Sequence, residues 1–176
     1  NTSLYPVAYN PTSQTYGNKK FPSLPRLLRE KGYETMTFHA DEVTFWNRDE
    51  LYPALGFDQY YDQKFIGTKD TIGMGASDEV LFSKALRVMQ EKKLNNQPFY
   101  AQLVTLTSHH PFTVPADRIN LKLPSKYKGT LTGAYLEAMN YNDMAIGKLI
   151  DGLKKAGIYD NSVIVIYGDH FGLQQS

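Results

Sequence analysis

An aspartate and a histidine stand side by side directly after a short apolar run. Asp169 and His170 follow Gly168, and residues 163–166 read Val-Ile-Val-Ile. A run of β-branched residues is typical of a buried strand, so the pair leaves the end of a rigid element. A carboxylate oxygen and an imidazole nitrogen can bind one divalent cation together. The pattern indicates a metal or catalytic pair; the alternative is that Asp169 caps a following helix and His170 is an exposed loop histidine.

Two other apolar runs also end in a histidine. His39 follows residues 35–38, and His109 comes shortly after residues 99–106; both runs read as strands. The carboxyl ends of parallel strands meet at one edge of a sheet, where open α/β folds bind their ligands. We therefore expect His39, His109 and His170 to share one site.

A tryptophan and an arginine follow closely after His39. Arg48 offers a planar set of donors to phosphate oxygens, and the face of Trp46 can pack on the carbon skeleton of a ligand. Together with His39 they suit an organic phosphate. The alternative is that Trp46 anchors the start of a helix while Arg48 pairs with a surface carboxylate.

His109 belongs to a His-His-Pro sequence. Pro111 restricts the residue before it to an extended conformation, and neighbouring residues of an extended segment point to opposite sides. Only one of the two histidines can readily face a site. We assign that role to His109, with His110 structural or exposed.

Helix signals separate these strands. Ser23 can cap a short helix that stops at Gly32, and Ser77 can cap a long one. Residues 50–55 and 132–156 also read as helices, whereas residues 60–75 and the stretch up to about residue 130 read as loops. The alternation of strand and helix predicts an α/β fold with a mainly parallel sheet covered on both faces.

The composition excludes several classes of function. The net charge of +1, without a Lys/Arg run, gives no footprint for nucleic acid, and the lack of cysteine excludes disulfides and thiolate chemistry. No run is long enough to span a membrane, so we expect a soluble segment. Because the chain opens with Asn1 in an irregular stretch, we expect residues 1–176 to be the central part of one catalytic domain of a larger protein.

Taken in order, the motifs resemble the alkaline phosphatase/sulfatase superfamily and, within it, the lipoteichoic acid synthase group of sulfatase-like glycerophosphotransferases. The resemblance rests on Phe-His at residues 38–39 with Thr-Phe-Trp-Asn-Arg-Asp at 44–49, on residues 103–112, and on residues 161–172. Gly-Asp-His after a strand is shared across the superfamily, whereas Phe-Trp-Asn-Arg-Asp is much narrower. The resemblance covers nearly the whole chain and implies a three-layer α/β sandwich, incomplete at both ends.

The resemblance also implies roles for the candidate residues. Asp169 and His170 resemble metal ligands of the family, for manganese, with magnesium as the other choice. His109 matches a histidine that binds the substrate phosphate, and His39, Trp46 and Arg48 match the glycerophosphate pocket. The family's nucleophilic threonine and a metal-binding glutamate belong to motifs expected before Asn1.

The implied reaction transfers glycerophosphate from phosphatidylglycerol to a growing polyglycerolphosphate chain through a glycerophosphoryl-threonine intermediate. The parent protein is then expected to be membrane-anchored, with this segment on the extracellular face of the cell membrane, and the fragment alone is expected to be inactive. The alternatives are a related phosphoethanolamine transferase, a phosphodiesterase, a sulfatase, or a non-catalytic sulfatase-like module that binds anionic polymer or lipid headgroups.

Overall fold

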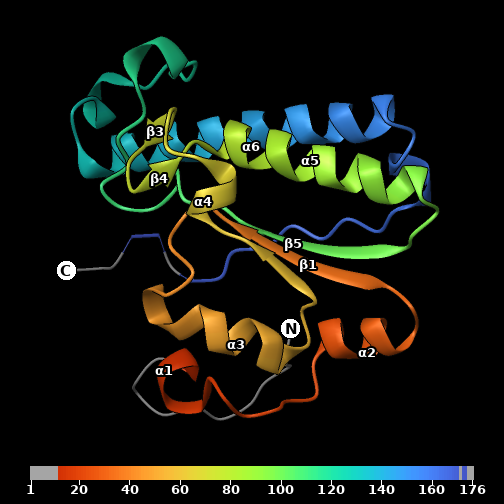
Figure 1. Cartoon of the computed structure of the whole chain (residues 1–176). Coiled ribbons are helices and arrows are strands. Elements are labelled where there is room, and N and C mark those ends of the chain that lie inside the picture. Colours follow the sequence, from red (N-terminus) through yellow and green to blue (C-terminus); the bar gives the residue numbers. More distant parts are fainter. Residues whose placement is uncertain (1–11, 171, 174–176) are drawn as a thin grey trace.

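The computed structural model describes residues 12–170 and 172–173 (Figure 1). Helices and strands alternate along these residues. In chain order the helices and strands are α1 (Thr12–Tyr16), α2 (Leu24–Glu30), β1 (Glu34–His39), α3 (Arg48–Leu55), β2 (Gln59–Tyr61), α4 (Gln63–Ile66), β3 (Thr71–Ile72), β4 (Gly75–Ala76), α5 (Asp78–Leu94), β5 (Phe99–Val104) and α6 (Leu131–Lys155). Single 3₁₀ turns lie at η1 (Phe45–Asn47), η2 (Ala116–Arg118), η3 (Ser125–Tyr127) and η4 (Tyr159–Asn161).

A parallel sheet lies at the centre of the molecule. Its strand order is β2-β1-β5, and Met36 in the middle strand is paired with Gln59 on one side and Ala101 on the other. Helices α5 and α6 cover one face of the sheet, and α2 and α3 lie on the opposite face (Figure 1). This arrangement of helix, parallel sheet and helix confirms the predicted α/β class with three layers. A separate antiparallel pair joins β3 to β4.

Side-chain caps set the start of the main helices, at the predicted Ser23 and Ser77 and at Thr130, which was not predicted. The side chains of Ser23, Ser77 and Thr130 each accept a hydrogen bond from a backbone N–H in the first turn of α2, α5 and α6. Such capping satisfies donors that a helix cannot pair internally. Gly56 ends α3 with φ of 93° and lies so close to Arg26 that a side chain would clash. Among the described residues, no helix combines the length and apolarity that crossing a membrane requires.

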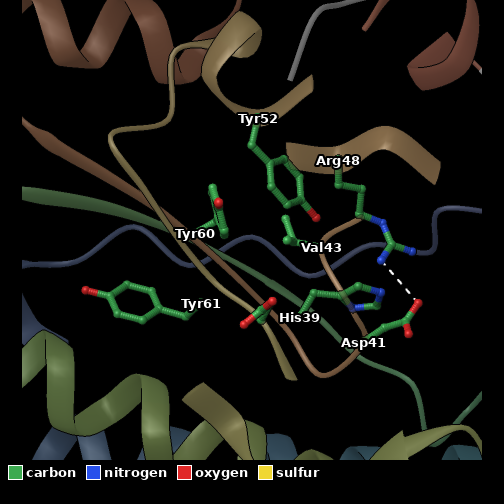
Figure 2. Close-up of a pocket in the computed structure, with 8 residues that line it drawn as sticks. His39, Asp41, Val43, Arg48, Tyr52, Tyr60 and Tyr61 are labelled. Carbon is green, nitrogen blue, oxygen red and sulfur yellow. Dashed lines mark hydrogen bonds and ion pairs between the residues drawn. The ribbon is translucent and has the colours of Figure 1, made fainter. Parts of the chain in front are cut away.

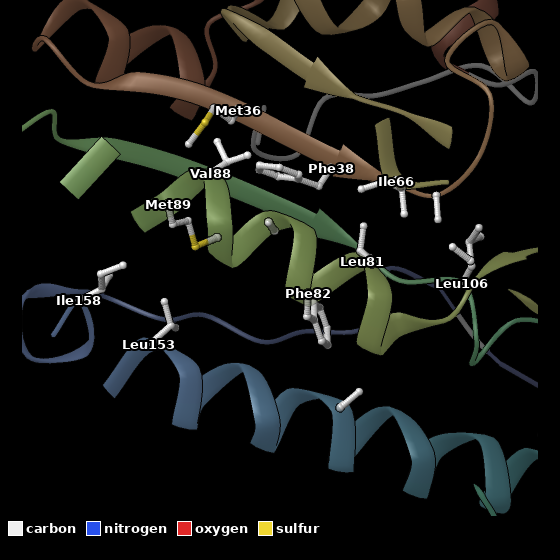
Figure 3. Packing of buried hydrophobic residues seen from close by; sticks show 14 residues of the cluster. Met36, Phe38, Ile66, Leu81, Phe82, Val88, Met89, Leu106, Leu153 and Ile158 are labelled. Atoms are coloured by element: carbon white, nitrogen blue, oxygen red, sulfur yellow. The ribbon is translucent and has the colours of Figure 1, made fainter. Parts of the chain in front are cut away.

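The core fills the space between the sheet and α5. Met36 and Phe38 point from β1 toward Leu81 and Val88 of α5 (Figure 3), and Met36, Phe38 and Leu81 are completely buried. Alternate residues of a strand face opposite sides of a sheet, so Thr35, Thr37 and His39 face the other layer. The packing therefore fixes which way His39 points.

Two strand predictions were wrong. Residues 163–166 form no strand, and Val163, Val165 and Ile166 are 94%, 74% and 65% exposed. The apolar side chains of these residues suit a buried strand. A strand also needs backbone hydrogen bonds to a neighbouring strand, and no described segment pairs with these residues. Conversely, β2 begins just before the stretch 60–75, which was expected to be a loop, and extends into it. A strand of three residues is too short to show the alternation of buried and exposed side chains. The sequence pattern therefore could not predict that it pairs with β1.

Candidate functional site

His39 lies at the carboxyl end of the central strand, and its ring is fixed. Its Nδ1 lies 3.0 Å from the carbonyl oxygen of Val104 at the end of β5, and the residue is 6% exposed. A carbonyl only accepts, so Nδ1 carries the proton in this contact, and the neutral ring then presents the lone pair of Nε2. Burial lowers the pKa of His39 below its usual 6.5, although the bond to Val104 partly offsets this. The ring can act as an acceptor or a metal ligand at neutral pH.

A shallow depression opens beside His39. It is lined by the side chains shown in Figure 2, and Arg48 and Asp41 form its charged side. Arg48 Nη1 lies 3.2 Å from Asp41 Oδ2, and both side chains are about four-fifths buried. The surrounding residues that complete the lining are Val43, Tyr52, Tyr60, Tyr61 and Asp62. The depression thus combines one guanidinium, which Asp41 holds, with a neutral imidazole and a second carboxylate, so its charge alone does not select an anion.

Local structure explains how these groups meet. Asp41 comes two residues after His39, and its carbonyl accepts a hydrogen bond from Gln63 N at 3.1 Å. Arg48 is the first residue of α3, and Tyr52 lies one helical turn further on. Residues four apart share one face of a helix, so Arg48 and Tyr52 approach His39 together.

His109 and His170 lie near each other although they come from different segments. Their ring centroids are 6.0 Å apart, in an edge-to-face arrangement. Both side chains are exposed, and His109 Nδ1 lies 2.9 Å from the carbonyl of its neighbour. His110 instead packs its ring against buried Phe112, with the centroids 5.6 Å apart. This division agrees with the expected structural role for His110.

A buried carboxylate holds the turn that leads to His109. Asp78 is completely buried at the start of α5, and its Oδ1 accepts from the backbone N–H groups of Leu106 at 3.0 Å and Thr107 at 3.2 Å. Its Oδ2 accepts from Asn142 of α6 at 2.9 Å. One side chain thus ties the end of β5 to both helices of the upper layer.

Asp169 and His170 provide the expected pair of donors. His170 Nε2 lies 3.7 Å from Asp169 Oδ1, and the charge of Asp169 is close enough to act on His39. A hard oxygen and a borderline nitrogen at this spacing fit one divalent cation. Within the described residues, however, no group of three or more His, Cys, Asp or Glu side chains could hold a metal ion. The pair fits a metal but needs further donors to complete its coordination.

The structure does not bring Trp46 into this depression. Trp46 is 48% exposed, lies against Phe45, and has a left-handed backbone with φ of 59°. It therefore does not anchor α3 in the core, as the alternative interpretation supposed. The other half of that interpretation is present, because Arg48 does pair with a carboxylate.

Sequence reasoning named only His39 and Arg48 among the eight residues that line the depression; Asp41 and Tyr52 are two of those it missed. Asp41 could have been found because residues two apart in an extended segment face the same side as His39. Tyr52 could have been found from its spacing of four from Arg48 in a predicted helix. Burial raises the pKa of Tyr52, so its phenol stays protonated at neutral pH.

Comparisons with known proteins agree with this fold. A family model described as Sulfatase matches residues 1–174. The chain is 36% identical over 177 residues to the lipoteichoic acid synthase of Staphylococcus aureus, covering 99% of this chain and 27% of that protein. The chain thus spans about a quarter of the length of this curated relative.

Two solved structures are also similar. The lipoteichoic acid synthase LtaP from Listeria monocytogenes matches with a TM-score of 0.87 and 49% identity, over 90% of this chain and 39% of that one. A protein of the alkaline phosphatase superfamily from Vibrio parahaemolyticus matches with a TM-score of 0.69 and 28% identity, over 82% of this chain and 34% of that one. These findings confirm the resemblance drawn from the motifs: the chain belongs to the sulfatase family.

Proposed function

We propose that the chain is the central part of the catalytic domain of a metal-dependent phosphotransferase, which moves glycerophosphate from phosphatidylglycerol to a growing lipoteichoic acid chain. The observation that carries this proposal is the proximity of the candidate residues beyond the end of β1: His39 lies beside Arg48, the charge of Asp169 acts on His39, and the rings of His109 and His170 lie 6.0 Å apart. The similarity to two lipoteichoic acid synthases supports the choice of glycerophosphate over sulfate or phosphoethanolamine.

In this proposal the basic groups hold the transferring phosphoryl group. The guanidinium of Arg48 donates to its nonbridging oxygens, and His109, as an imidazolium, donates a further hydrogen bond through Nε2, because its Nδ1 faces the carbonyl of His110. His39 offers a lone pair to a glycerol hydroxyl, and Asp41 keeps Arg48 oriented. Trp46 stays a candidate for packing on the glycerol carbons, from its exposed position before α3.

Asp169 and His170 are the proposed metal ligands. A bound divalent cation would neutralise phosphate oxygens and lower the pKa of an attacking hydroxyl. We propose manganese rather than magnesium, because an imidazole ligand suits manganese better than the harder magnesium ion.

The proposed reaction has two displacements. A threonine hydroxyl, expected before Asn1 from the resemblance, attacks the phosphorus of phosphatidylglycerol; the bond to diacylglycerol breaks, and diacylglycerol takes up a proton. The terminal hydroxyl of the polymer then attacks the glycerophosphoryl-threonine, gives up its proton, and releases the threonine. The proposed setting is the extracellular face of the membrane, where the lipid donor and the polymer meet.

The metal pair gives the direct test of this proposal. We expect Asp169→Ala and His170→Ala in the full-length protein to lower manganese-dependent release of diacylglycerol from phosphatidylglycerol by more than about a hundredfold, since losing even an outer-sphere partner of a metal ligand costs roughly 10- to 100-fold. Asp160→Ala, an exposed change in η4, is the control and should keep normal turnover. Undiminished turnover in the first two variants would contradict the assignment.

A further inference from the structure

A second cleft lies on the other side of the edge strand β2. It has a volume of about 360 Å³ and is formed by β2, α4 and one face of α5. Three cations line it, together with two aromatic rings and one carboxylate; these residues are Lys64, Lys84, Arg87, Tyr61, Phe65 and Glu91. Three positive charges against one negative charge make the cleft a binding site for an anion.

The cations of this cleft are available to a ligand. Lys64 and Arg87 are exposed, and neither forms a salt bridge with any residue that the structure describes. Lys84 lies 5.6 Å from the centre of the Phe65 ring, a contact that directs the ammonium group without neutralising it. Cations that have no protein partner are those that an anionic ligand can neutralise.

The aromatic wall of the cleft is rigid. Tyr61 stacks on completely buried Phe38 at 4.5 Å between centroids, and Phe65 packs on Tyr61 at 4.6 Å. The ring of Phe65 is 39% exposed, so part of this wall faces the solvent. Rigid rings beside charges suit a ligand that alternates anionic groups with short carbon segments.

Tyr61 connects this cleft with the depression around His39. It lines both, and Figure 2 shows its ring pointing away from His39 and Arg48. The next residues continue the path, because Asp62 lines the depression and Lys64 lines the cleft. A flexible chain that leaves the depression can therefore pass around the edge of the sheet into the cleft.

We propose that this cleft binds the polyglycerolphosphate chain, at phosphate groups next to the unit that is being extended. This inference rests on the proposed function. A linear polyanion fits because its phosphodiesters can meet successive cations while its glycerol links lie against Tyr61 and Phe65. A concave cleft suits a linear polymer better than the planar array of headgroups on a membrane, so we assign the cleft to the polymer.

The first test measures binding alone. In the intact extracellular domain, Lys64→Glu combined with Arg87→Glu should weaken calorimetric binding of a synthetic soluble glycerophosphate oligomer by about tenfold, because each exposed ion pair contributes up to roughly fivefold. Lys31→Glu combined with Lys155→Glu makes the same change of charge at exposed positions outside the cleft and should leave binding within about twofold. Equal binding by both double variants would overturn the proposal.

The second test separates the polymer from a lipid surface. The cleft variant should bind phosphatidylglycerol vesicles as the unchanged protein does; selective loss of vesicle binding, with oligomer binding kept, would overturn the proposal in favour of a lipid site.

With full-length protein, the variant should release diacylglycerol normally when free glycerol is the acceptor but make shorter polymers. Normal polymer length would count against the cleft. Failure of the unchanged protein to use phosphatidylglycerol would instead refute the proposed function, and the calorimetric test would still decide the cleft.

Discussion

The charged side chain of Arg48 is held in one orientation by its contacts with the protein. Arg48 Nη1 donates a hydrogen bond to Asp41 Oδ2 at 3.2 Å, and the guanidinium carbon lies 5.5 Å from the centre of the Phe45 ring. Arg48 lowers the pKa of His39 while Asp41 raises it, so the pair acts on His39 with opposing signs and burial decides the outcome. The ion pair therefore holds the guanidinium of Arg48 in one orientation and leaves the ring of His39 neutral.

Arg48→Ala and His109→Ala test the phosphate-binding role. Each change should weaken glycerophosphate binding by about 1.5–3 kcal/mol, the usual contribution of a hydrogen bond to a charged group. Arg48→Lys should restore little, because an ammonium group lacks the planar donor pair. Calorimetry on the intact domain measures this, with Arg29→Ala as a control that removes an exposed surface charge bridged to Asp58. Unchanged affinity in the first two variants would refute their role.

At the scale of elements, a few buried polar contacts hold the strand ends in place. Asp78 links α5, the end of β5 and α6, and its own N–H lies 3.2 Å from Thr107 Oγ1. A long connection follows β5, and the turn before His109 is also closed by the hydrogen bond from His109 N to the carbonyl of Leu106 at 3.0 Å. The position of an exposed site residue thus depends on a completely buried carboxylate.

Asp78→Ala should be among the most destabilising single changes in this chain. It leaves three buried donors without their acceptor, and each such group costs about 1–3 kcal/mol, so we expect a loss of roughly 3–5 kcal/mol after relaxation. Denaturant unfolding of the intact domain measures the free energy. Asp151→Ala, an exposed change in α6, should stay within about 0.5 kcal/mol. A similar small effect for Asp78→Ala would mean that water replaces the carboxylate.

Helices α2 and α5 were predictable from the caps that begin them, whereas α4, capped by Asp62, lies in the stretch expected to be a loop. Ser23 and Ser77 mark helix starts through local chemistry, and residues 99–104 carry enough β-forming side chains to be recognised without knowledge of their partner. Residues 163–166 carry the same pattern, but their state depends on pairing, which no local pattern contains. Short β2 depends on pairing in the same way.

The candidate site was predictable only in part. His39, His109 and His170 were grouped because strand ends share an edge; the rings of His109 and His170 do lie 6.0 Å apart, but residues 163–166 form no strand and neither ring lines the depression around His39. The ion pair of Arg48 with Asp41 could not be chosen among several acidic residues, since it depends on how α3 packs. Trp46 looked suited to the pocket by residue type, but its left-handed backbone turns it out of the depression.

At the scale of the whole molecule, a cluster of charges joins the long connection to both helices of one layer. Arg118 in η2 binds Asp70 through two nitrogens, at 2.7 and 3.1 Å, and lies 3.9 Å from Glu79 of α5. Glu79 also accepts from Lys148 and, at 2.9 Å, from Tyr141 of α6. Segments far apart in the sequence are therefore held by a connected set of ion pairs.

This cluster predicts a loss of stability in acid. The bond from Arg118 lowers the pKa of Asp70 below its usual 3.8, and the bond from Lys148 lowers the pKa of Glu79 below its usual 4.5. A carboxylate whose pKa is lower in the folded state contributes stability above its unfolded pKa and loses it as pH falls through the folded pKa. The free energy of unfolding should therefore begin to fall below about pH 4.5.

Arg118→Ala should make that acid slope shallower, and denaturant unfolding at a series of pH values measures it. Arg87→Ala removes an exposed arginine that has no salt bridge to a described residue and should leave the slope unchanged. Parallel slopes for the unchanged protein and Arg118→Ala would show that other carboxylates govern acid unfolding.

The exposed segment 162–167 has a consequence for handling the chain itself. Its sequence Ser-Val-Ile-Val-Ile-Tyr has no charge, no proline and no glycine, and most of its apolar surface faces solvent. Six-residue segments of this kind stack into cross-β fibrils when their backbone groups are unpaired. The same residues that lead to Asp169 and His170 therefore make the isolated chain prone to aggregation, and its stability in concentrated solution depends on supplying them with a backbone partner.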